Sequence, residues 1–408
     1  MLFDRRSILK AAGIAAASAA LKPAFAFAAT PGEARLVVVL LRGALDGLTA
    51  APPYGDPAYA SLRGELAIAR PGGSNGAHDL NGFFGLHPAL AGLSASYAKK
   101  ELIVFHAVAT PYRERSHFDG QDLLENGTPL PHGAQDGWLN RALLSLPRKS
   151  NAPGLAVGQN VPLILRGPAK VTSWAPDVLP AADSDTIARL MDLYADDKVL
   201  GPALAQGLST TALLNDSGVA GADQKGMGMA GGGANPAKFA SAVAKSVGTL
   251  LAAPDGPRVA VFELTGWDTH ANEGADAGVL AQRLGALDAA IASLAEALGP
   301  SWRDTAVLAV TEFGRTAAAN GTRGTDHGTG AAAFLVGGAV KGGRVIVDWP
   351  GLSSGVLYQG RDLAPTMDLR AVCKGVLSEH LGLGADALGN RVFPESGAVA
   401  PLSGLIKV

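Results

Sequence analysis

The sequence predicts an α/β fold in which a mostly parallel central sheet carries helices on both of its faces. Two patterns indicate this fold: short continuous apolar runs recur along the chain, and segments of helical periodicity separate them. Such runs are typical of strands buried on both faces, and their alternation with helices is typical of parallel sheets. With 408 residues, 48% of them hydrophobic, the chain is long enough to bury a large core.

The expected strands are five apolar runs, and each of them ends close to glycine, aspartate, glutamate or threonine. They are residues 36–41, 102–108, 259–264, 306–310 and 333–336. The expected helices are residues 87–97, 117–126, 137–146, 186–195, 237–251, 277–298 and 367–381. A glycine-rich stretch, residues 217–235, is expected to form a flexible insertion within a single domain that spans residues 30–408.

The first 29 residues have the order of a twin-arginine signal peptide. Arg5 and Arg6 precede a short apolar stretch, and small residues follow it up to Ala28 and Ala29, where cleavage is expected. The apolar stretch is shorter than the roughly 20 residues that span a bilayer, so we expect no stable membrane anchor after cleavage. The expected partner during export is the twin-arginine translocase, and the expected destination is the periplasm or the extracellular space.

Composition and motifs argue against several other classes of protein. A net charge of −2 gives no indication of a nucleic-acid partner. The single cysteine, Cys373, excludes an internal disulfide, and its helical surroundings predict a packed side chain rather than a reactive one. The chain has no phosphate-binding loop, no dinucleotide fingerprint and no G-x-S-x-G nucleophile elbow.

The candidate metal ligands are carboxylate and imidazole side chains near the ends of the expected strands. They are Asp46, Asp268, His270, Glu312, Asp326 and His327. Ligands bind beyond the carboxyl ends of the strands in sheets of this kind, which favours a shared site. Mixed carboxylate and imidazole donors suit Zn²⁺, Mn²⁺ or Fe, whereas carboxylates alone favour Mg²⁺ or Ca²⁺. The alternative is that these residues form turns with local hydrogen bonds.

Ser116 is the candidate nucleophile, because it precedes an expected helix whose N-terminus favours an anion. Arg113 and Arg115 are expected to hold a phosphate or sulfate group, and His117 is expected to be a ligand or a base. Ser116 and Asp119 also have the spacing of a capping box, so a purely structural role for the serine stays open. Both roles are compatible.

Several motifs give the chain a family resemblance. They are RGALDGL, FGLHPAL, PYRERSHFDGQDLLENG, DGWLNRAL, TEFGRT and GTDHGTG. From about Leu36 to the C-terminus, the chain resembles the bacterial family called domain of unknown function 1501, in which a twin-arginine signal is usual. That family resembles a distant branch of the alkaline phosphatase superfamily, which also includes sulfatases, and the resemblance implies an alkaline-phosphatase-like fold.

The superfamily resemblance also implies roles for individual residues. It implies a metal-binding aspartate at Asp46, a nucleophile at Ser116 and metal ligands at Asp268, His270 and His327. Two features differ from the superfamily pattern. Asp268 and His270 are two residues apart instead of four, and Phe313 stands where a ligand histidine is expected.

An alternative alignment places Asp326 and His327 on the superfamily's Asp-His motif and leaves the last ligand unassigned. These differences favour one metal ion, or a degenerate site, over a two-metal centre. The sequence therefore predicts an exported metal-dependent hydrolase that acts on a small phosphate or sulfate ester. The alternative is an exported binding or assembly protein that kept the fold and lost catalysis.

Overall fold

The structure is a computed structural model, and it describes residues 33–73, 75–146, 154–158, 160–175, 184–194, 196–216 and 235–407. The predicted signal peptide, residues 1–29, lies outside the described residues, as does all of the predicted glycine-rich insertion except Asn235. Among the described helices, none is long and apolar enough to cross a membrane.

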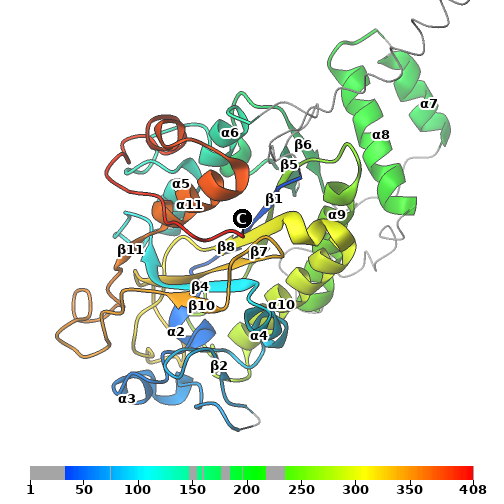
Figure 1. Cartoon of the computed structure of the whole chain (residues 1–408). Coiled ribbons are helices and arrows are strands. Elements are labelled where there is room, and N and C mark those ends of the chain that lie inside the picture. Colours follow the sequence, from blue (N-terminus) through cyan, green and yellow to red (C-terminus); the bar gives the residue numbers. More distant parts are fainter. Residues whose placement is uncertain are drawn as a thin grey trace, which may run out of the picture. The chain divides into compact units, whose positions relative to one another are not determined.

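A nine-stranded sheet forms the centre of the fold (Figure 1). The order along the main path is β10-β4-β9-β8-β1-β7-β5-β6, and β11 pairs with β4. The strands are β1 (Arg35–Arg42), β4 (Leu102–Ala109), β5 (Gly154–Val157), β6 (Val171–Trp174), β7 (Val259–Thr265), β8 (Thr305–Val310), β9 (Ala331–Val336), β10 (Arg344–Ile346) and β11 (Met367–Asp368). A separate antiparallel pair joins β2 (His78–Asp79) to β3 (Gly85–Leu86).

Strand β9 is antiparallel to both of its neighbours, β4 and β8. The other pairs in the nine-stranded sheet are parallel. Because β9 is reversed, its first residue, Ala331, lies at the edge where β4 and β8 end. The segment that enters β9 therefore meets the segments that leave β1, β4, β7 and β8, and this edge carries the candidate site.

The sheet has a hydrophobic core on each face, because alternate side chains of a strand point to opposite sides. In β1, Val37 and Val39 pack into the core that contains α9 and α10, whereas Leu36 and Val38 pack into the core that contains α6 and α11. Figure 1 shows α9 and α10 on one side of the sheet and α5, α6 and α11 on the other. The predicted α/β fold with helices on both faces is therefore confirmed.

The α-helices are α2 (Gly47–Ala50), α3 (Tyr59–Arg63), α4 (Ala91–Ala98), α5 (His117–Asn126), α6 (Trp138–Leu143), α7 (Ser184–Leu193), α8 (Leu200–Asp216), α9 (Pro236–Ala252), α10 (Val279–Leu298) and α11 (Leu369–Leu381). Short 3-10 turns are η1 (Gly64–Leu66), η2 (Leu163–Leu165) and η4 (Gly299–Asp304), and η5 (Ala387–Val392) is a π-helix.

Most differences from the predicted elements are at their ends. The segment expected to be helical over residues 367–381 begins as β11, because Met367 and Asp368 pair with β4. Asp368 then caps α11 by accepting a hydrogen bond from the Arg370 amide at 2.8 Å, so the helix starts at Leu369. Cys373 is buried in this helix, and burial raises its pKa to about 12, as expected for a packed thiol.

Candidate metal centre

Three side chains from distant parts of the chain converge at the carboxyl edge of the sheet. His117 is the first residue of α5, Asp268 follows β7, and His327 lies in the segment that enters β9. Each offers a ligand atom, and these atoms all lie within 4.8 Å of one another. We call these three residues the open cluster.

The His117 ring is held by the buried carboxylate of Glu312, which follows β8. The Glu312 Oε1 atom lies 2.8 Å from His117 Nδ1, and it also accepts bonds from the Gly43 amide and the Gln121 side chain. Burial would raise the pKa of Glu312, but the hydrogen bonds from His117 and its other neighbours lower it. Glu312, which the sequence predicted as a metal ligand, is therefore an ionised partner that orients His117.

With its Nδ1 atom engaged, His117 presents Nε2 to the cluster. This atom is buried and has no hydrogen-bond partner among the described residues. It lies 3.4 Å from Asp268 Oδ2. A buried polar atom without a hydrogen-bond partner is costly, and an ion bound between His117 and Asp268 would supply that partner.

His327 is oriented in the same way, by a backbone carbonyl. Its Nδ1 atom lies 2.9 Å from the carbonyl oxygen of Arg115, which can only accept, so Nδ1 carries the proton. The Nε2 atom is then an unprotonated donor for a metal, and it lies 3.2 Å from Asp268 Oδ1. Arg115 has φ +63°, a left-handed conformation that is uncommon outside glycine.

Asp268 is fixed by a buried arginine on the other side. Arg315 Nη1 lies 2.5 Å from Asp268 Oδ1, and Arg315 is itself bonded to Thr325. Burial would raise the pKa of Asp268, but the hydrogen bond and charge of Arg315 lower it. Asp268 therefore stays ionised.

Phe313 packs under both imidazole rings. Its ring centroid lies 5.0 Å from that of His117, in a stacked arrangement, and 5.2 Å from that of His327. The residue that stands where a ligand histidine was expected is buried and helps to set the angle of the two rings. It leaves no place for a second imidazole ligand at this position.

His270 and Asp326 extend the open cluster toward solvent. His270 Nε2 lies 3.0 Å from His327 Nε2 and 3.0 Å from Asp268 Oδ1. Asp326 lies 3.3 Å from His270 Nδ1 and holds the ring from the outer side. His270 therefore lies beside the open cluster with its Nε2 atom near Asp268 and His327, and Asp326 contacts its other ring nitrogen.

The donor set fits a divalent metal ion. Donors at about 2.0–2.1 Å around a tetrahedral ion lie roughly 3.3 Å apart. Between Asp268 and the three imidazole Nε2 atoms, the distances that the structure shows run from 3.0 to 3.4 Å. Two oriented imidazoles with a carboxylate suit Zn²⁺ or Mn²⁺ better than Mg²⁺, which takes oxygen ligands.

Asp46, which the sequence predicted as a metal ligand, lies in a different cluster and pairs with an arginine. It caps α2 by accepting bonds from the Leu48 and Thr49 amides, at 2.9 and 3.2 Å. Its Oδ2 atom pairs with Arg63 Nη2 at 2.5 Å, and both side chains are almost completely buried. The guanidinium supplies the cation that the sequence led us to expect from a metal.

Glu273 completes this second group, and we call Asp46, Arg63 and Glu273 the closed cluster. Glu273 Oε1 lies 3.6 Å from Arg63 Nη2, and Thr269 and Thr325 donate to Oε2. Burial, together with the negative charge of Asp46, raises the pKa of Glu273, whereas the charge of Arg63 keeps that of Asp46 low against the effect of burial. One guanidinium thus serves two carboxylates, and Glu273 is the one of the two that binds a proton more readily.

Arg113 and Arg115, which the sequence predicted to hold an anion, have other partners. Arg113 Nη1 donates to the carbonyl oxygens of Thr110 and Tyr112, at 2.5 and 2.6 Å. The Arg115 side chain pairs with buried Asp362, with Nη2 2.8 Å from Oδ2. Arg113 thus secures the end of β4, and Arg115 shapes the loop that carries its carbonyl to His327.

Ser116 lies at the start of α5, between Arg115 and His117. Its side chain makes no capping bond to the helix, so the predicted capping box does not form. Asp119 instead accepts a hydrogen bond from the Tyr112 hydroxyl, and that hydroxyl accepts one from the Ser116 amide. The Ser116 hydroxyl is therefore not committed to the helix and keeps its candidate role.

The sequence did not point to Arg63, Glu273, Arg315 or Asp362. A single charged residue in a loop or a short helix carries no periodic signal, and only the fold shows that these four are buried. Arg315 lies in the TEFGRT motif, and this motif was the one sequence signal that could have pointed to it.

The sequence also matches a family. The family described as "Protein of unknown function (DUF1501)" matches residues 94–389. The chain belongs to this family. The match covers His117, Asp268, Glu312 and His327, whereas Asp46 and Arg63 lie before its first residue. No curated protein matches the sequence significantly.

Similar solved structures are distant. The C-terminal periplasmic domain of EptC from Escherichia coli, in complex with Zn, is 11% identical over 74% of this chain and 72% of that chain, with a TM-score of 0.37. The lipoteichoic acid synthase LtaP from Listeria monocytogenes is 10% identical over 89% and 76%, with a TM-score of 0.38. Ps i-CgsB in complex with k-i-k-neocarrahexaose is 13% identical over 76% and 68%, also at 0.38. At these TM-scores, similarity to the three structures adds no information about the fold beyond the strand order of the sheet described above.

Proposed function

We propose that this protein is an exported hydrolase that uses one divalent metal ion to cleave a small phosphate or sulfate ester. The ion would be held by His117, Asp268 and His327, with His270 as a fourth donor. The observation that carries this proposal is the convergence of ligand atoms from His117, Asp268 and His327, in which the buried Nε2 atom of His117 has no hydrogen-bond partner among the described residues. A histidine held in this way by Glu312 is arranged as a metal ligand with its supporting carboxylate.

The side chains around the cluster would divide the remaining tasks. Arg315 keeps Asp268 ionised and in place, and Glu312 and the Arg115 carbonyl fix the two ring orientations. A bound divalent ion lowers the pKa of a hydroxyl group that it binds and neutralises charge on an ester oxygen.

Ser116 would be the nucleophile. Its oxygen would form the bond to phosphorus or sulfur while the bond to the ester oxygen breaks, and the departing alcohol would take up the proton that the serine loses. Water would then cleave the serine ester and restore the hydroxyl, so that the net reaction is hydrolysis.

Export through the twin-arginine translocase to the periplasm or the extracellular space is part of the proposal. It rests on the arginine pair and the small residues before Ala28 and Ala29. A translocase that carries folded proteins would allow the metal to be loaded in the cytoplasm, where its identity is controlled.

A non-catalytic binding or assembly protein is the second candidate. Two features favour it: Phe313 fills the position of a ligand histidine, and Arg113 and Arg115 are committed to internal partners. Such a protein would hold the metal and keep its cellular role when Ser116 is replaced by alanine.

Metal content and hydrolysis, measured on the same purified chain, test the proposal. We expect about one equivalent of Zn²⁺ or Mn²⁺ by elemental analysis, and turnover of an aryl phosphate or an aryl sulfate. His327→Ala should lose metal affinity by at least about 100-fold, since even the loss of a supporting partner costs roughly 10- to 100-fold. His132→Gln is the matched control, because His132 is an exposed histidine away from the cluster.

The possible results separate the candidates. Metal binding that depends on His327, together with turnover, supports the hydrolase. The same metal binding without turnover on either ester supports the binding protein. A wild-type chain that binds no metal when Zn²⁺, Mn²⁺ or Mg²⁺ is added overturns the proposal.

A further inference from the structure

We infer that Arg361 forms an anion-binding subsite next to the open cluster and holds the charged group of the substrate. This inference rests on the proposed function and assigns to Arg361 the role that the sequence had suggested for Arg113 and Arg115. It is carried by the charges around one buried carboxylate, that of Asp362.

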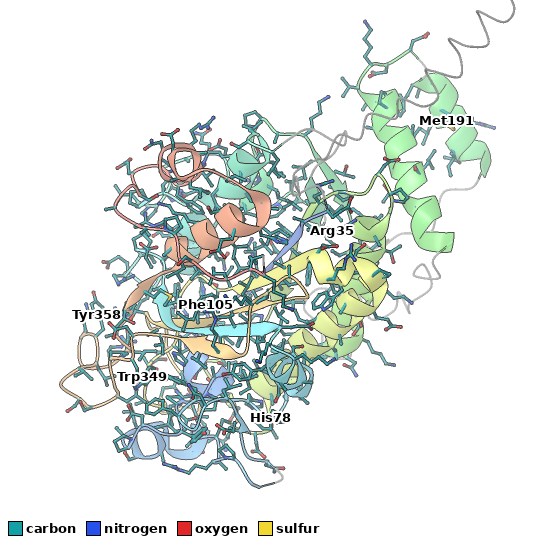
Figure 2. The ribbon with its side chains drawn as sticks, in the orientation of Figure 1. Arg35, His78, Phe105, Met191, Trp349 and Tyr358 are labelled. Atoms are coloured by element: carbon teal, nitrogen blue, oxygen red, sulfur yellow. The ribbon has the colours of Figure 1, made fainter. Side chains whose placement is uncertain are left out.

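Arg361 is attached directly to a residue of the open cluster. Its Nη2 atom donates to the carbonyl oxygen of His327 at 2.6 Å. The amide of Ala317 donates to the carbonyl of Arg361, and Thr316 pairs with Asp362. These contacts fix residues 358–362, the subsite loop, against the segment that enters β9. Tyr358, at the other end of this loop, is labelled in Figure 2.

Two arginines share the single charge of Asp362. Arg115 Nη2 lies 2.8 Å from Asp362 Oδ2, and Arg361 Nε lies 3.0 Å from Oδ1. The other partners of the two guanidinium groups are neutral, namely the Gln359 side chain for Arg115 and the His327 carbonyl for Arg361. The group formed by these two arginines and Asp362 therefore carries an excess positive charge.

Arg361 presents that excess charge to solvent. Its side chain is 43% exposed, whereas that of Arg115 is 17% exposed and Asp362 is completely buried. The exposed carboxylate of Asp326 also interacts electrostatically with Arg361, and it already accepts hydrogen bonds from Asn320 and His270. A guanidinium that is held in place on one side and exposed on the other suits a tetrahedral oxyanion.

The two sides of the subsite would then act on the same group. The open cluster supplies donors for a metal on one side, and Arg361 supplies a fixed positive charge on the other. The substrate class that this arrangement takes is an ester with at least one unesterified, negatively charged oxygen on phosphorus or sulfur. Neutral esters would gain nothing from Arg361.

Binding of inorganic phosphate and of sulfate to the full chain tests the inference, measured by calorimetry with and without added Zn²⁺. Arg361→Gln should weaken the binding of at least one of these anions by about 10- to 100-fold, because hydrogen bonds to charged groups are worth that much. Arg361→Lys keeps the positive charge and should therefore lose less anion affinity than Arg361→Gln. Zinc affinity should be unchanged in both variants, which distinguishes an anion contact from a general loosening of His327.

Arg323→Gln is the matched control, because it removes the same charge from an exposed arginine whose side chain bonds to Asn272. It should leave anion binding unchanged. Equal anion binding by wild type and Arg361→Gln, or no anion binding by wild type under either condition, overturns the inference while leaving a zinc-binding cluster intact. If the wild-type protein does not bind zinc, that result counts against the proposed function alone. The effect of Arg361→Gln on anion binding is also measured without added Zn²⁺, so the inference can still be tested.

Discussion

The open and closed clusters lie at the same edge of the sheet and use similar side chains, but they obtain positive charge differently. In the closed cluster, Arg63 is completely buried between Asp46 and Glu273 and supplies the cation from within the chain. In the open cluster, His117 and His327 direct Nε2 atoms toward Asp268, and no cation among the described residues lies between these three residues and solvent in the way that Arg63 lies between its two carboxylates. The first cluster therefore carries its own cation, whereas the second directs several possible ligand atoms toward one carboxylate.

This difference shows why a carboxylate at a strand end does not by itself identify a metal site. Buried charges must be compensated, and a guanidinium does this as well as an ion. What distinguishes the open cluster is the orientation of its imidazoles, with Nδ1 engaged by a carboxylate or a carbonyl and Nε2 directed inward. Substitutions in the closed cluster and in the open cluster can test this difference separately.

The largest effect is expected from Arg63→Met, and it concerns the free energy of unfolding. Removal of one partner from a buried ion pair costs about 3–5 kcal/mol, because the remaining charge has no compensation. We expect a loss of this size in the free energy of unfolding by urea, with metal affinity at the open cluster unchanged in the folded protein. Arg323→Met, on the surface, should change stability by less than about 0.5 kcal/mol. An extra equivalent of metal in Arg63→Met would show that the closed cluster accepts an ion.

The second-largest effect is expected from Glu312→Gln, and it concerns metal affinity. This substitution keeps the shape of the side chain but removes its charge. The variant should hold His117 less well and weaken metal affinity by about 10- to 100-fold. Competition with a chelator measures this change, and His132→Gln again serves as the control. Unchanged affinity would mean that Glu312 is a structural residue with no part in the metal centre.

The pH dependence of stability should reveal Glu273. Burial and Asp46 raise its pKa in the folded protein, so the folded state holds a proton that the unfolded chain releases above about pH 4.5. Glu273 therefore stabilises the fold less and less as the pH rises through the neutral range.

Glu273→Gln should remove this trend. Between pH 5 and 8, wild type should lose more than about 1 kcal/mol relative to the variant, since one pKa unit is worth 1.36 kcal/mol. The low pKa of Asp46 acts in the opposite direction, but only at pH values near or below 3.8. Parallel stability curves for the two proteins would contradict a protonated Glu273.

The smallest effect on stability is expected from Ser116→Ala. The Ser116 hydroxyl makes no capping bond, so its removal should change the free energy of unfolding by less than about 0.5 kcal/mol. Metal affinity should not change, and ester hydrolysis should be lost. Retained hydrolysis would assign the attack to another group, and a loss near 1 kcal/mol would restore the capping role.

The central strands could be predicted because they leave a strong signal. Continuous apolar runs marked β1, β4, β7, β8 and β9 to within two residues, since burial on both faces admits few polar side chains. The sequence did not reveal β5, β6 and β10. These strands are three or four residues long, and the two outermost, β6 and β10, are only partly buried, so no long apolar run marks them.

The candidate site was predictable in part, and for the same reason. Strand ends located the residues of the open cluster, because parallel strands end at one edge. Their partners were not predictable, since the pairing of Asp46 with Arg63, or of Arg115 with Asp362, joins a strand end to a loop or a short helix. The reversed direction of β9 was also missed, although His327 was expected before that strand.

The strand order has a consequence for biosynthesis. Among the described strands β1 comes first in chain order and is near the middle of the sheet, and its two neighbours, β7 and β8, begin at Val259 and Thr305. Its six apolar residues from Leu36 to Leu41 therefore have no strand beside them until most of the chain has been translated. Pairings between such distant segments form slowly and leave unpaired strands open to aggregation. Shielding of β1 until synthesis has passed Val310 would limit such aggregation, and the open cluster is complete only after His327 has been added.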